Sequence, residues 1–165
     1  LTESVCRRPW AEVLEAVIAG GADAIQVREK HLEPTALVDR VRAVIEIARP
    51  AGIPVVVNDR ADVAVAAAAD GVHLGQDDLP VEAARRVVGG LALIGGSAHD
   101  LDEARRNHEA GCDYCGIGRF AASTTKPDVV AGGPALVRAM SATFPEWPQL
   151  AIGGIGWACG RRQEA

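Results

Sequence analysis

The chain has 165 residues, 48% of them hydrophobic, and a formal net charge of -5. This length and composition are typical of one globular domain, so we expect a single domain over residues 1–165. The acidic balance argues against a nucleic-acid binder, which needs a basic face. The most apolar segment, residues 61–72, is interrupted by Asp62 and Asp70, and nothing resembles a signal peptide. We therefore expect no membrane span and a cytoplasmic protein.

Short apolar runs alternate with amphipathic stretches along the chain. The apolar runs predict strands at residues 24–27, 53–57, 71–74, 91–95, 113–118 and 149–154. The amphipathic stretches predict helices at residues 9–19, 35–49, 61–68, 80–88, 101–110 and 134–143. Asp100, with Glu103 three residues later, is a capping signal for the fifth helix, and Gly111 ends it. Pro134 suits the first position of the sixth helix.

The predicted strands are nearly continuously apolar, which is typical of a sheet buried on both faces. Such a sheet has parallel strands joined by crossover helices. The alternation lacks a Gly-x-Gly-x-x-Gly turn, so it favours a barrel over a dinucleotide-binding open sheet. We predict an α/β fold of the (β/α)8 TIM-barrel type. Because about six strands are visible, we expect the barrel to be incomplete, with the first and last strands missing and the domain truncated at both ends.

Polar side chains follow every predicted strand, at the ends that form the catalytic face of such barrels. In chain order they are Gln26, Arg28, Glu29 and Lys30; Asn58, Asp59 and Arg60; Asp77 and Asp78; Ser97 and His99; Ser123, Thr124, Thr125 and Lys126; and the Gly153–Gly154 turn. One polar loop is ordinary, but six in succession, with two lysines and several carboxylates, indicate an active site rather than a solvated rim.

The basic residues at these strand ends suggest an anion site. Gln26, Arg28 and Lys30 alternate, so in an extended segment they project to one side, which suits a multiply charged anion. Lys30 and Lys126 are the only lysines among seventeen basic residues. Either nucleotide bias left them by chance, or a compact ammonium charge is needed at both places.

Two carboxylates at the ends of neighbouring strands suggest a metal site. Asp59 and Asp78 can share a hard divalent cation such as Mg2+, which keeps open positions for phosphate oxygens. The alternatives are local: Asp59 can pair with Arg60, and Asp77 or Asp78 can cap the helix that follows Pro80. After the last two predicted strands, the hydroxyls of Ser123 and Thr125 and the amides of Gly153 and Gly154 suit a phosphate. Together with the anion site at residues 26–30, this gives two anion sites, which predict two phosphorylated substrates.

The histidines and cysteines carry less information. His73 lies inside an apolar strand and is expected to pack in the core, whereas His99 is either a general base or a surface residue. The single Cys-x-x-Cys pair, Cys112 and Cys115, has neither a second pair nor suitably spaced histidines for zinc. We expect free, buried thiols.

Five motifs in order closely resemble the thiamine phosphate synthase family. They are GADAIQVREK, VNDRADVAVAAAADGVHLGQDDLP, the Ser-Ala-His at 97–99, GCDYCGIGRF followed by TTKPD, and AIGGI, and they span about residues 20 to 155. The resemblance implies a (β/α) barrel transferase of thiamine biosynthesis. Its reaction joins hydroxymethylpyrimidine diphosphate to thiazole phosphate, releases pyrophosphate and depends on Mg2+.

The resemblance also implies roles for individual residues. The pyrimidine diphosphate is expected to be held within segment 26–30, including Val27 and Glu29, and by Asn58, Ser97 and Lys126. The thiazole phosphate is expected to be bound by Ser123, Thr124, Thr125 and Gly154. The residues expected to act in catalysis are Arg28, Lys30, Ser97 and Lys126. The Mg2+ ligands are expected to be Asp59 and Asp78, with Asp77 tuning charge or capping the next helix.

Some positions depart from the family pattern. Gly96 replaces a β-branched residue, Arg119 and alanines replace an apolar loop, and residues 156–165 no longer resemble the family. Two alternatives are a thiazole tautomerase-like enzyme and an inactive, truncated phosphate-binding remnant. Retention of the pyrimidine-diphosphate set argues against the tautomerase; that set is Arg28, Lys30, Asn58, Asp59 and Asp78. Small-molecule substrates are the expected partners, and a homo-oligomer is left open.

Overall fold

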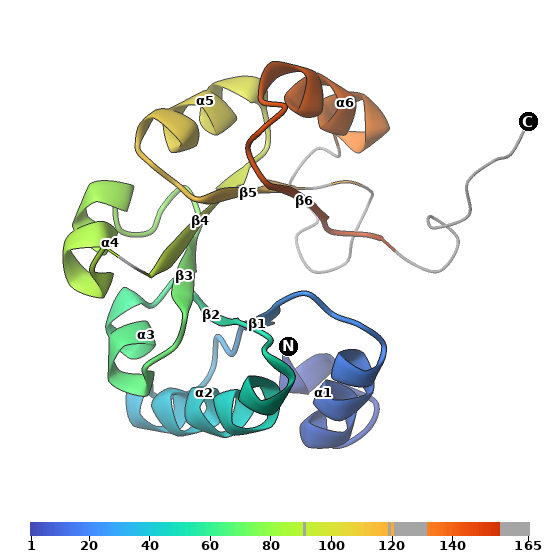
Figure 1. Cartoon of the computed structure of the whole chain (residues 1–165), viewed down its shortest axis with the longest axis vertical. Helices are drawn as coiled ribbons and strands as arrows, with labels where there is room; N and C mark the ends of the chain where they lie inside the picture. Colours follow the sequence, from blue (N-terminus) through green and yellow to red (C-terminus); the bar gives the residue numbers. More distant parts are fainter. Residues whose placement is uncertain (91, 119, 121–131, 156–165) are drawn as a thin grey trace, which may run out of the picture. The chain divides into compact units, whose positions relative to one another are not determined.

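The computed structural model describes residues 1–90, 92–118, 120 and 132–155 (Figure 1). The chain divides into two compact units, Leu1–Ile94 and Gly95–Ala165. It passes from one unit to the other inside strand β4 (Leu93–Ala98). The single domain expected from the sequence stays a prediction.

The first unit alternates strands and helices. Its strands are β1 (Ile25–Val27), β2 (Val55–Asn58) and β3 (Gly71–Leu74). Its helices are α1 (Trp10–Ala19), α2 (Pro34–Ala48), α3 (Ala61–Ala67) and α4 (Val81–Val88), with short 3-10 turns η1 (Glu3–Val5) and η2 (Arg49–Ala51). The strands pair in parallel, with Val57 of β2 opposite both Val27 of β1 and Val72 of β3. Their carboxyl ends therefore meet at one edge of the sheet.

The core of this unit follows directly from the sequence pattern. Every residue of β3 is buried, as are the three valines of β2. Helix α2 buries Leu37, Val41, Val44, Ile45 and Ala48, a helical spacing that presents one apolar face. Side chains buried on both faces of the sheet explain why its strands read as continuous apolar runs.

The second unit repeats the same construction. Strands β4, β5 (Tyr114–Gly118) and β6 (Gln149–Ile152) pair in parallel, and helices α5 (Leu101–Glu109) and α6 (Gly133–Thr143) follow β4 and precede β6. Asp100 caps α5 by accepting a hydrogen bond from the Glu103 amide at 2.8 Å. Trp147 is buried and donates its indole N–H to the carbonyl of Cys112 at 2.9 Å. This bond ties the segment before β6 to the turn before β5.

All the strands and helices predicted from the sequence are present, and their bounds differ by a few residues. The largest difference is in β4, which ends at Ala98 rather than at residue 95, so Ser97 lies within the strand. The Asp100 cap is confirmed, whereas Pro134 is the second residue of α6 and not the first. None of the helices in the described ranges has the length and hydropathy of a membrane span.

Cys112 and Cys115 are free and buried, as expected; Cys6 is also free but only half-buried, and Cys159 lies outside the described residues. Burial raises the pKa of the Cys115 thiol to about 12, so this thiol stays protonated at neutral pH.

One close approach in the first unit requires a glycine. A Cβ on Gly71, the first residue of β3, would lie 2.2 Å from the carbonyl oxygen of Leu93, a contact that backbone atoms cannot relieve without moving. We expect Gly71→Ala to lower the free energy of unfolding by about 1–3 kcal/mol, the usual cost of overpacking. Urea denaturation measures this change. Gly90→Ala is the matched control, because a Cβ there meets nothing within 4 Å; equal losses from both variants would contradict the assignment.

Candidate active site

The strand ends of the first unit bring an aspartate into an unusual conformation. Asp59 follows β2 with a φ of 66°, in the left-handed region that Asp and Asn tolerate better than most residues. Its amide donates to the carbonyl of His73 at 2.8 Å, so the turn after β2 is attached to β3. His73 itself is only 4% exposed, which confirms it as a core histidine.

Asp59 and Asp78 are neighbours, as the sequence predicted. Burial raises the pKa of Asp59, and a hydrogen bond and like charge from Asp78 raise it further. Asp78 also accepts a hydrogen bond from the Gly75 amide at 2.6 Å, which fixes the carboxylate in its turn. Two carboxyl groups this close share a proton or need a cation between them. The pair therefore fits a divalent cation.

The structure contains neither of the local roles that the sequence offered as alternatives, pairing of Asp59 with Arg60 and capping of the next helix by Asp77 or Asp78. Arg60 pairs with Asp62, through nitrogen–oxygen distances of 2.8 and 2.6 Å, rather than with Asp59. The residue before helix α4 is Pro80, and no side chain caps that helix, so the expectation that Asp77 or Asp78 caps it is wrong. The reason is position: Pro80 occupies the N-cap, so both aspartates lie before it, and Asp78 accepts from the Gly75 amide instead.

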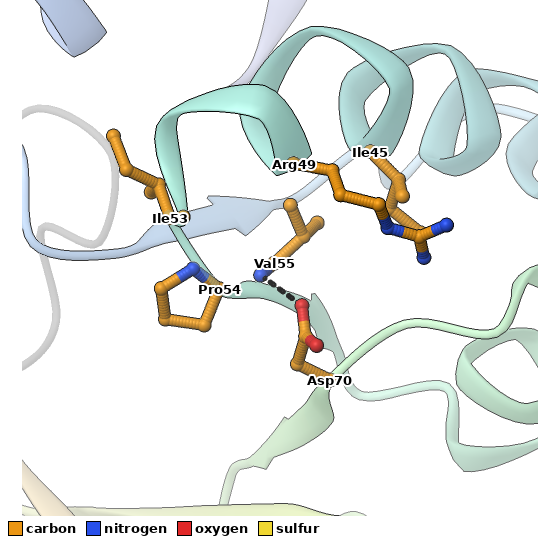
Figure 2. Close-up of a pocket in the computed structure, with 7 residues that line it drawn as sticks. Ile45, Arg49, Ile53, Pro54, Val55 and Asp70 are labelled. Atoms are coloured by element: carbon orange, nitrogen blue, oxygen red, sulfur yellow. Dashed lines mark hydrogen bonds between the residues drawn. The ribbon is translucent and has the colours of Figure 1, made fainter.

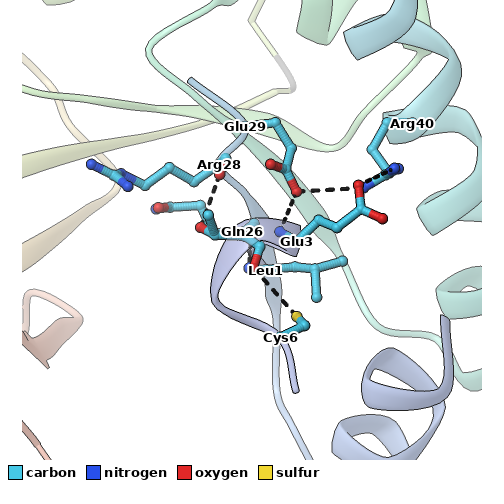
Figure 3. A network of polar contacts seen from close by, with 8 residues as sticks. Leu1, Glu3, Cys6, Gln26, Arg28, Glu29 and Arg40 are labelled. Atoms are coloured by element: carbon cyan, nitrogen blue, oxygen red, sulfur yellow. Dashed lines mark hydrogen bonds and ion pairs between the residues drawn. The ribbon is translucent and has the colours of Figure 1, made fainter. Parts of the chain in front are cut away.

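Two cations lie beside this carboxylate pair. The Lys30 Nζ is 3.8 Å from an Asp59 carboxylate oxygen, and the charges of Lys30 and Arg28 both lower the pKa of Asp59 against the larger effects that raise it. Gln26 and Arg28 extend to the same side of the chain, as their alternation predicted (Figure 3). A pocket of about 210 Å³ opens here. Its lining residues are Glu29, Lys30, Leu32, Leu37, Asn58, Asp59 and Arg60.

Glu29 uses its carboxylate differently from its two basic neighbours. Its Oε1 accepts from the Glu3 amide at 2.6 Å and pairs with Arg40 at 3.4 Å (Figure 3). The side chain is 9% exposed. Sequence reasoning placed Glu29 with the substrate-binding residues but missed Arg40, because nothing in the spacing connects a residue of α2 with the end of β1.

In the second unit, Ser97 lies on β4 opposite Gly116 of β5. The Asn107 side chain, from helix α5, donates to the Ser97 carbonyl at 2.8 Å. A Cβ on Gly96 would lie 2.7 Å from that same amide nitrogen, so the glycine makes room for Asn107. The unexpected glycine thus has a packing reason, and Asn107 is a second residue that sequence reasoning missed.

The other predicted positions of this unit are placed only in part. His99 follows β4, and its Nδ1 lies 2.9 Å from a Glu103 oxygen that also accepts from the His99 amide. Gly153 and Gly154 follow β6 with φ values of 91° and 70°, in the region that favours glycine. Ser123, Thr124, Thr125, Lys126 and Arg119 lie outside the described residues.

A second pocket, of about 200 Å³, lies at the amino end of β2, away from the turn that holds Asp59 (Figure 2). Asp70 accepts there from the Val55 amide at 2.7 Å, and the Asp70 amide donates to the Val55 carbonyl at 2.9 Å. Asp70, just before β3, therefore hydrogen-bonds both backbone polar groups of Val55 at the start of β2, so its role is structural.

Parallel strand–helix units with charged residues at the strand carboxyl ends are the arrangement of α/β barrel-type enzymes, whose active sites lie at that face. A family model described as thiamine monophosphate synthase matches residues 1–160, and the chain belongs to this family. It is 46% identical over 152 residues to the thiamine-phosphate synthase of Chloroflexus aurantiacus, covering 92% of this chain and 69% of that protein. It is 43% identical over 150 residues to that of Moorella thermoacetica, covering 90% and 70%.

A solved structure supports the same assignment. Thiamine phosphate pyrophosphorylase from Pyrococcus furiosus matches with a TM-score of 0.85 and 32% identity, over 94% of this chain and 73% of that one. The α/β fold of TIM-barrel type that the sequence predicted is thereby confirmed, and so is the resemblance to the family.

The raised pKa of Asp59 makes a prediction about stability. A carboxyl group whose pKa is raised on folding stabilises the protein fully only below its unfolded pKa, and this contribution is lost as the pH rises through the folded value. Without divalent cations, Asp59→Asn should therefore raise the Tm at pH 7, and the gain should shrink as the pH falls towards 4. Asparagine also tolerates the left-handed φ of this position. Thermal melts in a chelating buffer at several pH values measure the effect.

Asp62→Asn is the control for this experiment. The hydrogen bond from Arg60 lowers the pKa of Asp62, so this carboxylate adds a little stability above its unfolded pKa and loses it on acidification. Its substitution should give no gain at pH 7. A Tm increase of the same size in both variants would show that the Asp59–Asp78 repulsion is not the cause.

Proposed function

We propose that this protein is a thiamine phosphate synthase, which condenses hydroxymethylpyrimidine diphosphate with thiazole phosphate and releases pyrophosphate. The observation that carries the proposal is the Asp59–Asp78 pair with Lys30 and Arg28 beside it. Paired carboxylates with cations beside them suit a diphosphate that arrives with a divalent cation. Membership of the family supports the same reaction.

Asp59 and Asp78 are the proposed Mg2+ ligands. When bound, Mg2+ would supply Lewis-acid stabilisation of the charge on the diphosphate oxygens. Among the described residues no group of three or more His, Cys, Asp or Glu side chains could hold a metal ion. Two protein carboxylates are sufficient for Mg2+, which keeps water and phosphate oxygens in its remaining positions.

The proposed role of the cations is to stabilise the leaving group. When the bond between the methylene carbon and the diphosphate oxygen breaks, its electron pair goes to pyrophosphate. Arg28 and Lys30 would then face more negative charge than in the bound substrate, so their attraction stabilises the transition state more than the ground state. The thiazole nitrogen donates its lone pair to the same carbon. The electron-rich pyrimidine supports the positive charge at that carbon, so no protein nucleophile is required.

The remaining residues belong to the proposal through the family resemblance. Gln26, Asn58 and Ser97 would orient the pyrimidine diphosphate, and Lys126 would face its phosphates. The Ser123–Thr125 segment and Gly154 would bind the thiazole phosphate. Cytoplasmic location and a homo-oligomeric state stay predictions.

The direct test is to mix the purified protein with both precursors and Mg2+, and to follow thiamine phosphate and pyrophosphate together. Equimolar appearance of the two products, abolished by a chelator and restored by Mg2+, is the expected result. No product from a protein that melts cooperatively would contradict the proposal and favour the phosphate-binding remnant. Stabilisation by thiazole phosphate alone would identify what such a remnant binds.

A pair of neighbouring substitutions tests the metal ligands. Asp78→Asn keeps an oxygen that can accept from the Gly75 amide but removes the charge, so the fold should survive while turnover falls about 100-fold or more, since even indirect ligand partners cost 10–100-fold. Asp77→Ala should change turnover by less than about threefold, because Asp77 is exposed and has no place in the proposed site. The measurement is initial rate against Mg2+ concentration. Equal losses from the two variants would refute the assignment.

A further inference from the structure

The proposed diphosphate site contains an unfavourable charge in its own sequence. Glu29 stands between Arg28 and Lys30, the two cations that the proposed function assigns to the diphosphate. A carboxylate in this segment repels a polyanion and offsets one of the two positive charges. The segment can attract a diphosphate strongly only if the Glu29 charge is neutralised or directed away.

The structure neutralises the charge and turns the carboxylate to Arg40, although Glu29 itself lines the pocket with Lys30 and Asp59. Gln26 and Arg28 extend to one side of the chain, and the Glu29 carboxylate extends to another, towards Glu3 and Arg40 (Figure 3). Glu29 is 9% exposed and accepts from the Glu3 amide at 2.6 Å, while Arg40 lies 3.4 Å away. Because so little of Glu29 is solvated, water screens its charge weakly, and a nearby cation must compensate it.

Arg40 is held in place for this role. It projects from helix α2, its guanidinium lies 4.5 Å from the centre of the Trp10 ring of α1, and its second nitrogen pairs with Glu3 at 2.8 Å. The Arg40 side chain is 15% exposed, whereas the Glu3 side chain is 52% exposed. Solvent therefore screens Glu3, and the buried partner of Arg40 is Glu29.

Arg28 and Lys30 flank Glu29 in the sequence, but the ion pair that the described contacts place at the Glu29 carboxylate is the one with Arg40.

We propose that Arg40 is a positioning residue for the diphosphate site: it neutralises Glu29 and keeps the Glu29 Oε1 on the Glu3 amide and the Arg40 guanidinium, so that Arg28 and Lys30 present a net positive segment to the substrate. This inference rests on the proposed function, because that function assigns the diphosphate to Arg28 and Lys30. Arg40 acts through Glu29 and does not contact the substrate.

A purely structural role for Arg40 gives a different expectation. If Arg40 only ties α1, α2 and η1 together, then removing both Arg40 and Glu29 removes more contacts and harms the protein at least as much as removing Arg40 alone. If charge neutralisation is the role, removal of the Glu29 charge repairs the loss. The double variant therefore separates the two accounts.

The experiment compares wild type, Arg40→Met and Arg40→Met/Glu29→Gln, with inorganic pyrophosphate and Mg2+ as the calorimetric probe. Arg40→Met should weaken pyrophosphate binding about tenfold, the order of effect of one uncompensated charge, and should raise KM for the pyrimidine diphosphate more than it lowers kcat. The double variant should recover most of the affinity. Arg42→Met is the matched control: Arg42 is on the same helix but donates to the Ala66 carbonyl, so pyrophosphate binding should not change.

Unchanged binding in Arg40→Met, a double variant no better than the single one, or no pyrophosphate binding by the wild type would each overturn the inference. If wild type binds pyrophosphate and the variants follow the expected order, but no thiamine phosphate forms, then the proposed function fails while the role of Arg40 stands. Thermal melts of each variant identify any that is unfolded, and Arg40→Lys, which keeps the charge, then replaces Arg40→Met with a smaller expected loss of affinity.

Discussion

The site depends on one constraint: two carboxylates, Asp59 and Asp78, are held together although their charges repel. The fold enforces this arrangement from both sides. A left-handed turn tied to β3 carries Asp59, and a backbone amide in the next turn holds Asp78. Parallel strands bring these two turns to the same edge of the sheet. Such strain persists only where surrounding structure determines it, and it is common at ligand sites because binding relieves it.

The cations around this pair gain their effect from the same geometry. Lys30 and Arg28 lie close enough to Asp59 to act on its protonation, yet burial and Asp78 act more strongly. Without a ligand, the region therefore contains opposed charges that do not fully cancel. A diphosphate arriving with a divalent cation adds charges of both signs and can satisfy both groups of side chains, whereas a lone anion or a lone cation satisfies only one.

The fold was predictable because local and global signals agree. Short, largely apolar runs such as 71–74, bounded by turn residues, are typical of strands buried on both faces, and α2 shows its buried face through regular spacing. The neighbouring aspartates were also predictable, since parallel pairing fixes which strand ends meet. The end of β4 was placed too early because its glycines and Ser97 are poor strand formers, and pairing with β5 overrides that preference.

The residues that sequence reasoning missed share a physical reason. Arg40 and Asn107 lie on helices and act on strand ends through contacts that depend on how a helix packs on its sheet. Their sequence separation from those strand ends gives no periodic signal. The roles of Asp77 and Arg60 were misread in the same way, because charge proximity along the chain suggested partners that the folded turns do not provide.

The contact between Gly96 and Asn107 has a consequence for relatives of this protein. A Cβ on residue 96 would overlap the Asn107 amide that reaches the Ser97 carbonyl, at 2.7 Å, and the Cys112 sulfur, at 2.9 Å, so that space cannot hold all of them. These two positions are therefore expected to change together, so that a relative with a branched residue at the first would carry a smaller or shorter-reaching residue at the second. A protein changed at only one of the two positions would be less stable than one in which the two positions match. Evolution from one pairing to the other therefore requires two changes, the first of which lowers stability.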